Sequence, residues 1–330
     1  MMNLLTLTAP KLGISTKNSS AFSPTRIQAS AVRIAIVILV LLAAVLVDGF
    51  TSAHNISSIL FMTVSVGIAA CGLSMVTISG NLFMLSMSAT TSVCTIVFAS
   101  TLQFGISAAI VMTLLVGLIC GILQGLAVGV MKANPIITTI AASSIITGIG
   151  SWFSGGRTIT SDVQVPWLGI GHIVSGVPNQ FLILLLVWAL ASFFLSRMRL
   201  GREIKLIGIN KNTAQLSGLR LGWAITAAYM IAALTAALTG ILIASQTSQG
   251  NLSLGSGLDF SAIAAVLIGG VAITGGQGRI SDAVFGALFL AIISDVLLLK
   301  GFSLDIQLMV KGAVVLVSVL LGALLRRQSH

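Results

Sequence analysis

The sequence predicts an all-α polytopic membrane protein of about ten transmembrane helices. Apolar residues make up 56% of its 330 residues and charged residues only 7%, whereas soluble domains carry roughly 25% charged residues. Apolar stretches of about 20 residues, the length that a helix needs to cross a bilayer, recur between short polar segments. These observations exclude one soluble core and predict a single membrane domain over residues 32–330.

The first apolar run, Ile34 to Val47, follows a long polar and basic leader. Residues 1–31 contain no carboxylate and many hydroxyl side chains, so we expect a disordered, basic cytoplasmic tail there. A signal peptide has a shorter charged leader and a small-residue cleavage site. We therefore expect the first apolar run to remain as a membrane anchor.

Further apolar segments follow along the rest of the chain. The ten predicted spans cover residues 32–48, 56–78, 83–102, 106–131, 135–153, 180–196, 222–244, 260–275, 283–299 and 306–325. The stretch 79–90 (SGNLFMLSMSAT) is polar for a span, which favours a broken or re-entrant element. An even number of crossings places both termini on the same side of the membrane.

The basic residues indicate which side that is. With a cytoplasmic N-terminus, Arg157 and Lys300 fall outside and Lys311 falls within a span, which leaves fourteen of the seventeen Lys and Arg inside. This asymmetry agrees with the positive-inside rule and predicts that both termini are cytoplasmic. The basic residues behind the net charge of +10 therefore lie in cytoplasmic loops and do not form one binding face. For this reason, no nucleic-acid partner is expected.

Two connections are long enough to carry a function. The outer one, 154–179, contains two prolines and Trp167 and is expected to lie at the membrane interface. In the inner one, 197–221, Asn210 can cap a short helix that Gly218 ends. A capped amphipathic helix in a cytoplasmic loop offers a docking surface for a soluble partner. An ordinary connecting loop that carries only orientation signals is the alternative.

The titratable residues do not indicate a catalytic or metal site. The three histidines lie far apart in the sequence without ligand-like spacing, which argues against metal and triad patterns. The glycine-rich stretch 275–278 is followed by Arg279 and Ile280, without the Lys and hydroxyl of a phosphate loop. We therefore expect a protein that is not an enzyme, binds no metal or cofactor, and hydrolyses no ATP by itself.

Four glycines at intervals of four lie in the fourth span, namely Gly117, Gly121, Gly125 and Gly129. This spacing places them on one helical face, where another backbone can approach closely. Helix packing is the main expectation, and a narrowing of a solute path is the alternative. Gln124 lies next to this face and requires a polar partner or water.

Asp295 and Lys311 are the two charges that the predicted spans place inside the hydrocarbon. They lie at similar depth on consecutive antiparallel spans. An unpaired charge at this depth costs roughly 2.5–3.5 kcal/mol on insertion scales. We therefore predict an intramembrane ion pair between them, with a proton or ion relay as the alternative.

Most other polar residues at membrane depth are small and neutral, which suits a polyhydroxylated or otherwise uncharged solute. For any single one of them, helix packing is the simpler explanation; as a group they predict a hydrophilic path. The residues predicted to line this path are Asn81, Ser86, Gln124, Asn134, Thr138 and Thr139, together with Met84, which is discussed below.

Several segments resemble the membrane permease subunits of ABC importers for ribose and related sugars. They are 201–218 (GREIKLIGINKNTAQLSG), 262–280 (AIAAVLIGGVAITGGQGRI), 307–314 (QLMVKGAV), 120–140 (CGILQGLAVGVMKANPIITTI) and the pair Gly155-Gly156. They occur in the family's order between about residue 56 and residue 325. Each motif alone is weak, but together they are fairly specific.

The resemblance implies a ten-helix permease in the inner membrane of a bacterium, working as a pair of identical or related subunits. Two cytoplasmic ATPase domains would bind ATP and Mg, and a periplasmic binding protein would deliver the solute. The helix near 211–217 would be the coupling helix that docks on the ATPase. The coupling loop is then represented by Gly201, Arg202, Glu203, Asn210, Asn212, Ala214, Leu216, Ser217 and Gly218.

Two departures from the family pattern bear on the solute: Met84 replaces an acidic residue near the third span, and Ser261 stands where Asp is common. Gln124 stands where relatives usually carry Asn, a modest change that keeps the amide. We expect import of a monosaccharide, with a nucleoside or an amino acid as alternatives. Two other classes stay open, an ion-coupled secondary transporter that uses Asp295 and a structural membrane subunit without transport.

Overall fold

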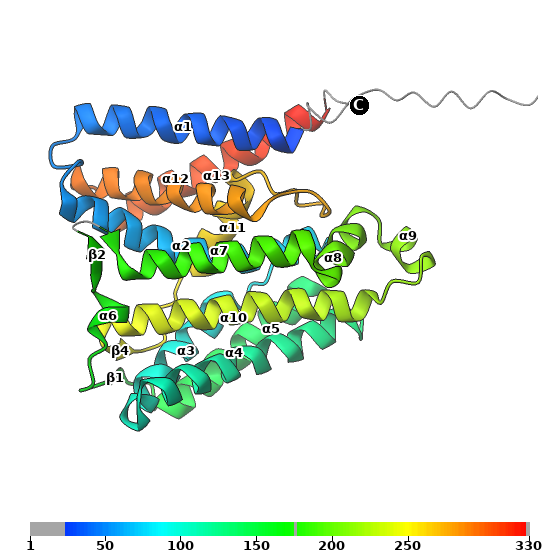
Figure 1. Cartoon of the computed structure of the whole chain (residues 1–330), viewed down its shortest axis with the longest axis horizontal. Coiled ribbons are helices and arrows are strands. Elements are labelled where there is room, and N and C mark those ends of the chain that lie inside the picture. The colour runs from blue at the N-terminus through cyan, green and yellow to red at the C-terminus, as the bar shows by residue number, and fades with distance from the viewer. Residues whose placement is uncertain (1–23, 175–176, 328–330) are drawn as a thin grey trace, which may run out of the picture.

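The computed structural model describes residues 24–174 and 177–327, which form a bundle of helices with four very short strands (Figure 1). The helices are α1 (Pro24–Leu46), α2 (Ala53–Ile78), α3 (Met87–Thr101), η1 (Leu102–Phe104), α4 (Ile106–Gly129), α5 (Pro135–Ser154), α6 (Pro166–Gly169), α7 (Asn179–Arg197), α8 (Arg199–Ile209), α9 (Lys211–Leu216), α10 (Leu221–Thr247), α11 (Leu258–Ile268), α12 (Ile280–Leu299) and α13 (Leu304–Arg327). The strands are β1 (Ile159–Thr160), β2 (His172–Val174), β3 (Val177–Pro178) and β4 (Gln249–Gly250).

The prediction of an all-α polytopic membrane protein is confirmed. Among the residues described, eight helical segments are long and apolar enough to cross a membrane. They are α1, α2, α3 with η1, α4, α5, α7, α10 and α12. Helix α13, which is not one of these eight segments, is 24 residues long. The start of α1 and the end of α13 lie at the same end of the bundle as α8 and α9, and the strands and α6 lie at the opposite end (Figure 1).

The first helix begins earlier than predicted. It starts at Pro24, where proline is favoured in the first helical turn, so residues 24–31 are helical and the prediction of disorder is wrong for them. The rest of the predicted tail, residues 1–23, lies outside the described residues.

The eighth predicted span, 260–275, is wrong. Helix α11 contains 11 residues, which at 1.5 Å per residue gives a length of only about 16 Å. It ends at Ile268 because the following chain turns at Gly269 and Gly270, and Gly270 adopts a φ of +92°. The backbone of Gly269 also packs so closely on the Asp282 carbonyl that a Cβ atom there would overlap it.

Two non-helical segments interrupt the bundle, and they share a sequence. Residues 79–86 separate α2 from α3, and residues 248–257 separate α10 from α11. The tripeptide Gly-Asn-Leu occurs in both, at residues 80–82 and 250–252. Because α2 and α10 run in opposite directions (Figure 1), the same motif appears in the two halves with inverted orientation, a pattern known from transporters with inverted repeats.

Hydroxyl side chains of α3 hydrogen-bond to the backbone of the second interruption. Thr95 Oγ1 donates to the Asn251 carbonyl at 3.2 Å, and Ser92 Oγ donates to the Leu252 carbonyl at 2.9 Å. Ser88 Oγ donates to Asp259 Oδ1 at 2.6 Å and accepts from the Asp259 backbone N–H at 3.1 Å. Non-helical backbone at membrane depth requires such partners, so α3 holds this segment in place.

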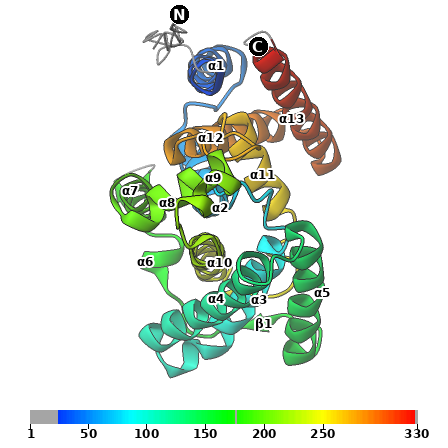
Figure 2. The ribbon, with the colours of Figure 1, turned by 90° about the vertical axis from the view of Figure 1, so that its right-hand side faces the viewer.

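Figure 2 shows how the helices are arranged when the bundle is viewed from the end that carries α9. Helices α5 and α13 lie on one side, with α3 and α11 between them, whereas α7 lies on the opposite side. The long helices α2 and α10 lie inside the bundle and are largely buried.

Candidate functional site

The short helix predicted in the inner loop is present as α9. The Asn210 side chain caps it by accepting a hydrogen bond from the Thr213 N–H at 3.0 Å. Gly218 follows the helix with a φ of +75°, a conformation that favours glycine. Ala214 faces inward and is buried, whereas the Leu216 side chain is 89% exposed. Helix α9 therefore presents an uncovered leucine at the tip of the bundle (Figure 1).

A shallow cavity of about 430 Å³ adjoins α9. Its lining residues are Leu206, Ile209, Asn210, Thr213, Ala214, Ser217 and Leu219. Exposed apolar side chains mixed with polar ones, next to the exposed leucine, are typical of a surface that docks a protein partner.

The remaining residues of the predicted coupling loop have different roles. Gly201 of α8 packs so closely on the Phe194 carbonyl that a Cβ atom would overlap it. Glu203 accepts a hydrogen bond from Arg199 at 3.0 Å within one helix; the Arg199 side chain is exposed, whereas that of Glu203 is largely covered. The side chains of Arg202, Asn212 and Ser217 are exposed.

Helix α8 meets the 79–86 interruption and the loop between α11 and α12 through glycine backbones. A Cβ atom at Gly208 would overlap the Ile78 carbonyl oxygen and the backbone N of Gly276, and Gly80 lies directly beside Gly208. The Gly276 N–H donates to the Ile78 carbonyl at 2.8 Å. We call the contact of Ile78, Gly80, Gly208 and Gly276 the inner junction. It joins the loop that carries α9 to the ends of α2 and α11.

One hydrogen bond and one pair of neighbouring positive charges accompany the inner junction. Lys211, the first residue of α9, donates to Asn81 Oδ1 at 3.3 Å, and Asn81 is itself buried. Partial burial and the nearby positive charge of Arg279 lower the pKa of Lys205 on α8. Helix α8 therefore lies close to both the 79–86 interruption and the loop after α11.

The four glycines of α4 lie against α10. A Cβ atom at Gly117 would lie 2.5 Å from the Ala237 Cβ, and one at Gly121 would lie 2.8 Å from the Met230 Cα. Gly125 and Gly129 face Thr226 in the same way, and Thr226 Oγ1 donates to the Gly125 carbonyl at 2.9 Å. We call this contact the α4–α10 seam.

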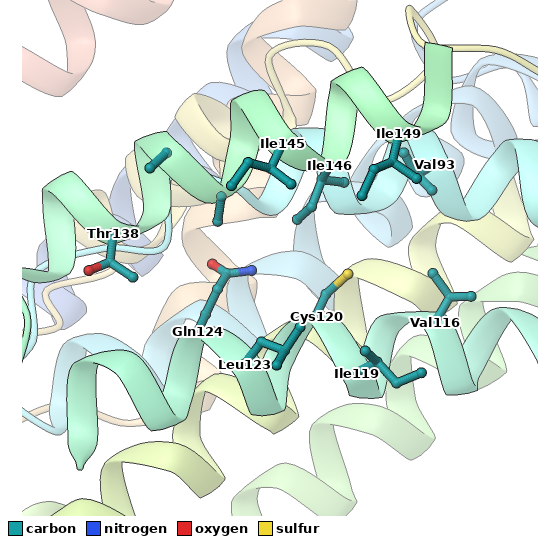
Figure 3. A pocket seen from close by; sticks show the side chains of 12 residues that line it. Val93, Val116, Ile119, Cys120, Leu123, Gln124, Thr138, Ile145, Ile146 and Ile149 are labelled. Carbon is teal, nitrogen blue, oxygen red and sulfur yellow. The ribbon is translucent and has the colours of Figure 1, made fainter. Parts of the chain in front are cut away.

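Three residues of the predicted solute path come together between α3, α4 and α5. Ser86 Oγ donates to Gln124 Oε1 at 2.5 Å, and the Gln124 Nε2 atom is buried without a hydrogen-bond partner in the described residues. Gln124 and Thr138 border a cavity of about 470 Å³ (Figure 3). The rest of its lining is almost entirely apolar, with isoleucines of α5 facing Leu123 and Ile119 of α4.

The other predicted path residues lie apart from this cavity. Asn134 caps α5 by accepting from the Ile136 N–H at 3.0 Å, and Thr139 Oγ1 donates to the Pro135 carbonyl at 2.9 Å. Asn81 belongs to the contacts near the inner junction, and Met84 is fully buried in the 79–86 interruption.

The ion pair predicted between Asp295 and Lys311 is not formed among the described residues. Asp295 Oδ2 instead accepts a hydrogen bond from Asn55 Nδ2 at 2.8 Å, and the Asn55 side chain also donates to the Phe50 carbonyl. The amide at the start of α2 thus replaces the expected ammonium group. Lys311 lines a different polar cavity, described below.

An ion pair between α1 and α12 was not predicted from the sequence. Arg33 of α1 donates to Asp282 of α12 at 2.6 Å, and its guanidinium lies 5.1 Å from the centre of the Phe285 ring. Both charges were visible near the inner ends of the first and ninth predicted spans. Their equal depth was the available signal, although nothing in the sequence showed that these helices are neighbours.

Replacing Arg33 with Leu is expected to lower the free energy of unfolding by about 1–2 kcal/mol, because the buried Asp282 carboxylate loses its partner while Arg33 is partly exposed. Denaturant unfolding of the purified chain measures this. The control is Arg199→Leu, which removes an arginine that is 89% exposed and pairs with Glu203 four residues away in the same helix, and it should cost only about 0.5 kcal/mol. Equal losses in both variants would contradict the assignment.

Comparison with known proteins identifies the family. Residues 55–319 match the family described as "Branched-chain amino acid transport system / permease component". The chain is 31% identical over 302 residues to the "Probable ABC transporter permease protein YphD" of Escherichia coli (strain K12), covering 90% of each protein. It is also 29% identical to the "Ribose import permease protein RbsC" of Haemophilus influenzae, covering 87% of this chain and 90% of the relative. RbsC of Escherichia coli (strain K12) is 30% identical, with 87% of this chain and 91% of the relative covered.

No solved structure matches the chain. The family match nevertheless covers most of the bundle, from the first turn of α2 to the last turns of α13. The chain therefore belongs to the family of permease components of branched-chain amino acid transport systems.

Proposed function

We propose that this chain is the membrane permease subunit of an ABC importer that carries a monosaccharide such as ribose into a bacterial cell. The names of its relatives support this proposal, because YphD is named as a probable ABC transporter permease and RbsC as a ribose import permease. Ser86, Gln124 and Thr138 are neutral hydrogen-bonding groups, which suit an uncharged solute.

The working importer contains two permease chains, two cytoplasmic ATPase domains that bind ATP and Mg, and a periplasmic binding protein. The chain lies in the inner membrane with both termini in the cytoplasm, as its basic residues favour. ATP binding closes the two ATPase domains, and α9 of each permease converts this closure into a rocking of the two bundles. The solute then passes between them.

The single observation that carries the proposal is the link between α9 and the membrane core. The exposed Leu216 offers the ATPase an apolar contact. Lys211 at the other end of α9 donates to Asn81 in the 79–86 interruption, and α8 joins the inner junction. A force on α9 therefore acts directly on the interrupted helices.

Replacing Leu216 with Asp is expected to weaken co-purification with the partner ATPase by about tenfold or more, because burying an exposed apolar anchor drives such contacts. ATP-driven uptake into proteoliposomes should fall with it. Ile170→Asp is the control, since Ile170 is also exposed and directly follows α6, which lies at the opposite end of the bundle (Figure 1). It should leave ATPase binding unchanged, and unchanged binding in the Leu216 variant would disprove the docking role of α9.

Uptake energetics separate this proposal from an ion-coupled transporter. With ATP supplied, a protonophore should leave solute uptake in the reconstituted importer unchanged. Uptake that stops when the proton gradient collapses would identify a secondary transporter instead. If the reconstituted importer takes up nucleosides or amino acids but no monosaccharide, the assignment as an ABC importer still holds. Only the assigned solute then changes.

A further inference from the structure

A second cavity, of about 400 Å³, lies between α2, α11, α12 and α13 near the end of α10. Its volume falls in the range of ligand pockets, roughly 300–1,000 Å³. Six of its lining residues are polar, namely Ser65, Gln246, Ser261, Ser294, Gln307 and Lys311. The cavity beside Gln124, in contrast, has an almost entirely apolar lining (Figure 3).

Most of these polar groups are not used by the protein itself. Ser294 Oγ donates to the Leu290 carbonyl, and Gln307 Nε2 donates to the Phe302 carbonyl. The other four polar side chains have no hydrogen-bond partner within residues 24–174 and 177–327. Polar groups inside a membrane protein require partners, so the cavity must hold water or a polar solute.

Lys311 is the one charged group of this lining. No carboxylate lies within 4.0 Å of its ammonium group in the part of the chain that the structure describes, because Asp295 is held by Asn55. An ammonium group with three free N–H donors binds the hydroxyl and carbonyl oxygens of a solute directly. Phe61 adds an aromatic face to the same cavity.

The cavity is also connected to the outer loop. The Phe61 ring packs edge-on against His172 of β2, with ring centres 6.0 Å apart. His172 Nε2 lies 2.9 Å from Ser57 Oγ of α2. The outer loop therefore touches the wall of the cavity at the end of the bundle opposite α9 (Figure 1).

We propose that this cavity is a binding subsite for an oxygen-rich solute of monosaccharide size, in which Lys311 donates hydrogen bonds to the solute oxygens. The subsite deepens the proposed function and rests on it for the identity of the solute. Ser65, Gln246 and Ser261 complete the hydrogen-bonding set, and Phe61 contacts the apolar face of the solute.

The first test measures whether the cavity is accessible to water and carries a positive potential, and it needs no solute. Ser261→Cys is introduced into a chain whose three native cysteines are replaced by serine, and the full-length protein is placed in lipid nanodiscs. A negatively charged methanethiosulfonate reagent should react about tenfold faster than a positively charged one, because Lys311 attracts anions. Adding Lys311→Gln should abolish this preference.

Two control variants show whether the charge preference depends on Lys311 and on this cavity. Lys300→Gln removes a lysine that donates to the Leu46 carbonyl away from the cavity, and it should leave the preference intact. A cysteine at Ala142, in the apolar cavity, should react slowly with both reagents. No reaction at position 261, or a preference that survives Lys311→Gln, would overturn the subsite.

The second test measures ribose uptake by the reconstituted importer. Lys311→Gln should lower uptake about tenfold at subsaturating ribose, by raising KM, and saturating ribose should restore most of the uptake. Lys300→Gln should transport normally. Normal ribose uptake by the Lys311 variant would refute the subsite. If the wild-type importer does not transport ribose but the labelling results are as expected, the monosaccharide assignment is wrong. The cavity is then a subsite for another oxygen-rich solute.

Discussion

Replacing Gly121 with Val should destabilise the chain by about 3 kcal/mol, near the upper end for overpacking substitutions. The Cβ atom alone would lie 2.8 Å from the Met230 Cα and 3.0 Å from the Tyr229 carbonyl oxygen. These neighbours belong to the backbone of α10 and cannot move aside as a flexible side chain can. The α4–α10 seam must therefore open, and the many contacts along it are lost together.

Unfolding of the purified chain in detergent, followed by circular dichroism, measures this loss. Gly148→Val in α5 is the matched control, because no heavy atom lies within 4 Å of a Cβ built there. It makes the same change in another transmembrane helix and should leave stability unchanged or slightly higher, since glycine is a poor helix former. A Gly121 variant as stable as this control would show that the two helices do not pack as described.

Replacing Gly208 with Ala should separate ATPase binding from transport. A Cβ atom at this position would overlap the Ile78 carbonyl and the Gly276 backbone, so α8 must move away from the inner junction. Helix α9 and its Leu216 contact remain available to the ATPase. We expect near-normal ATPase binding, uptake reduced at least about tenfold, and a loss of about 1–3 kcal/mol in stability.

Comparing ATPase co-purification with uptake in proteoliposomes tests this separation. Gly312→Ala of α13 is the control, because a Cβ there meets no heavy atom within 4 Å. It should retain both activities. If the Gly208 variant keeps full uptake, the inner junction does not transmit the motion of α9.

Elements defined by local chemistry were predictable from the sequence. Asn210 and Gly218 lie at the two ends of α9, and both act through backbone groups only a few residues away. Long apolar runs likewise identified α2, α4, α5, α7, α10 and α12. Such signals need no knowledge of the neighbouring helices.

Features that depend on distant partners were not predictable. Apolar composition continues past Ile268, so nothing local marks the end of α11; the close contact of Gly269 with Asp282 contributes to it. Asn55 lies far from Asp295 in the sequence, so depth alone suggested Lys311 as the partner. The hydroxyls of Ser92 and Thr95 resembled ordinary helix residues because their acceptors lie on another segment.

Helix α3 and the segment before it contact parts that lie at opposite ends of the bundle. The segment before it touches α8 at the inner junction, and its own hydroxyls hold the interruption before α11, which pairs with the outer strand β1. Contacts at both ends of the bundle therefore converge on this one helix and the segment before it. If α8 moves in the working importer, we expect the segment after α10 to shift with it.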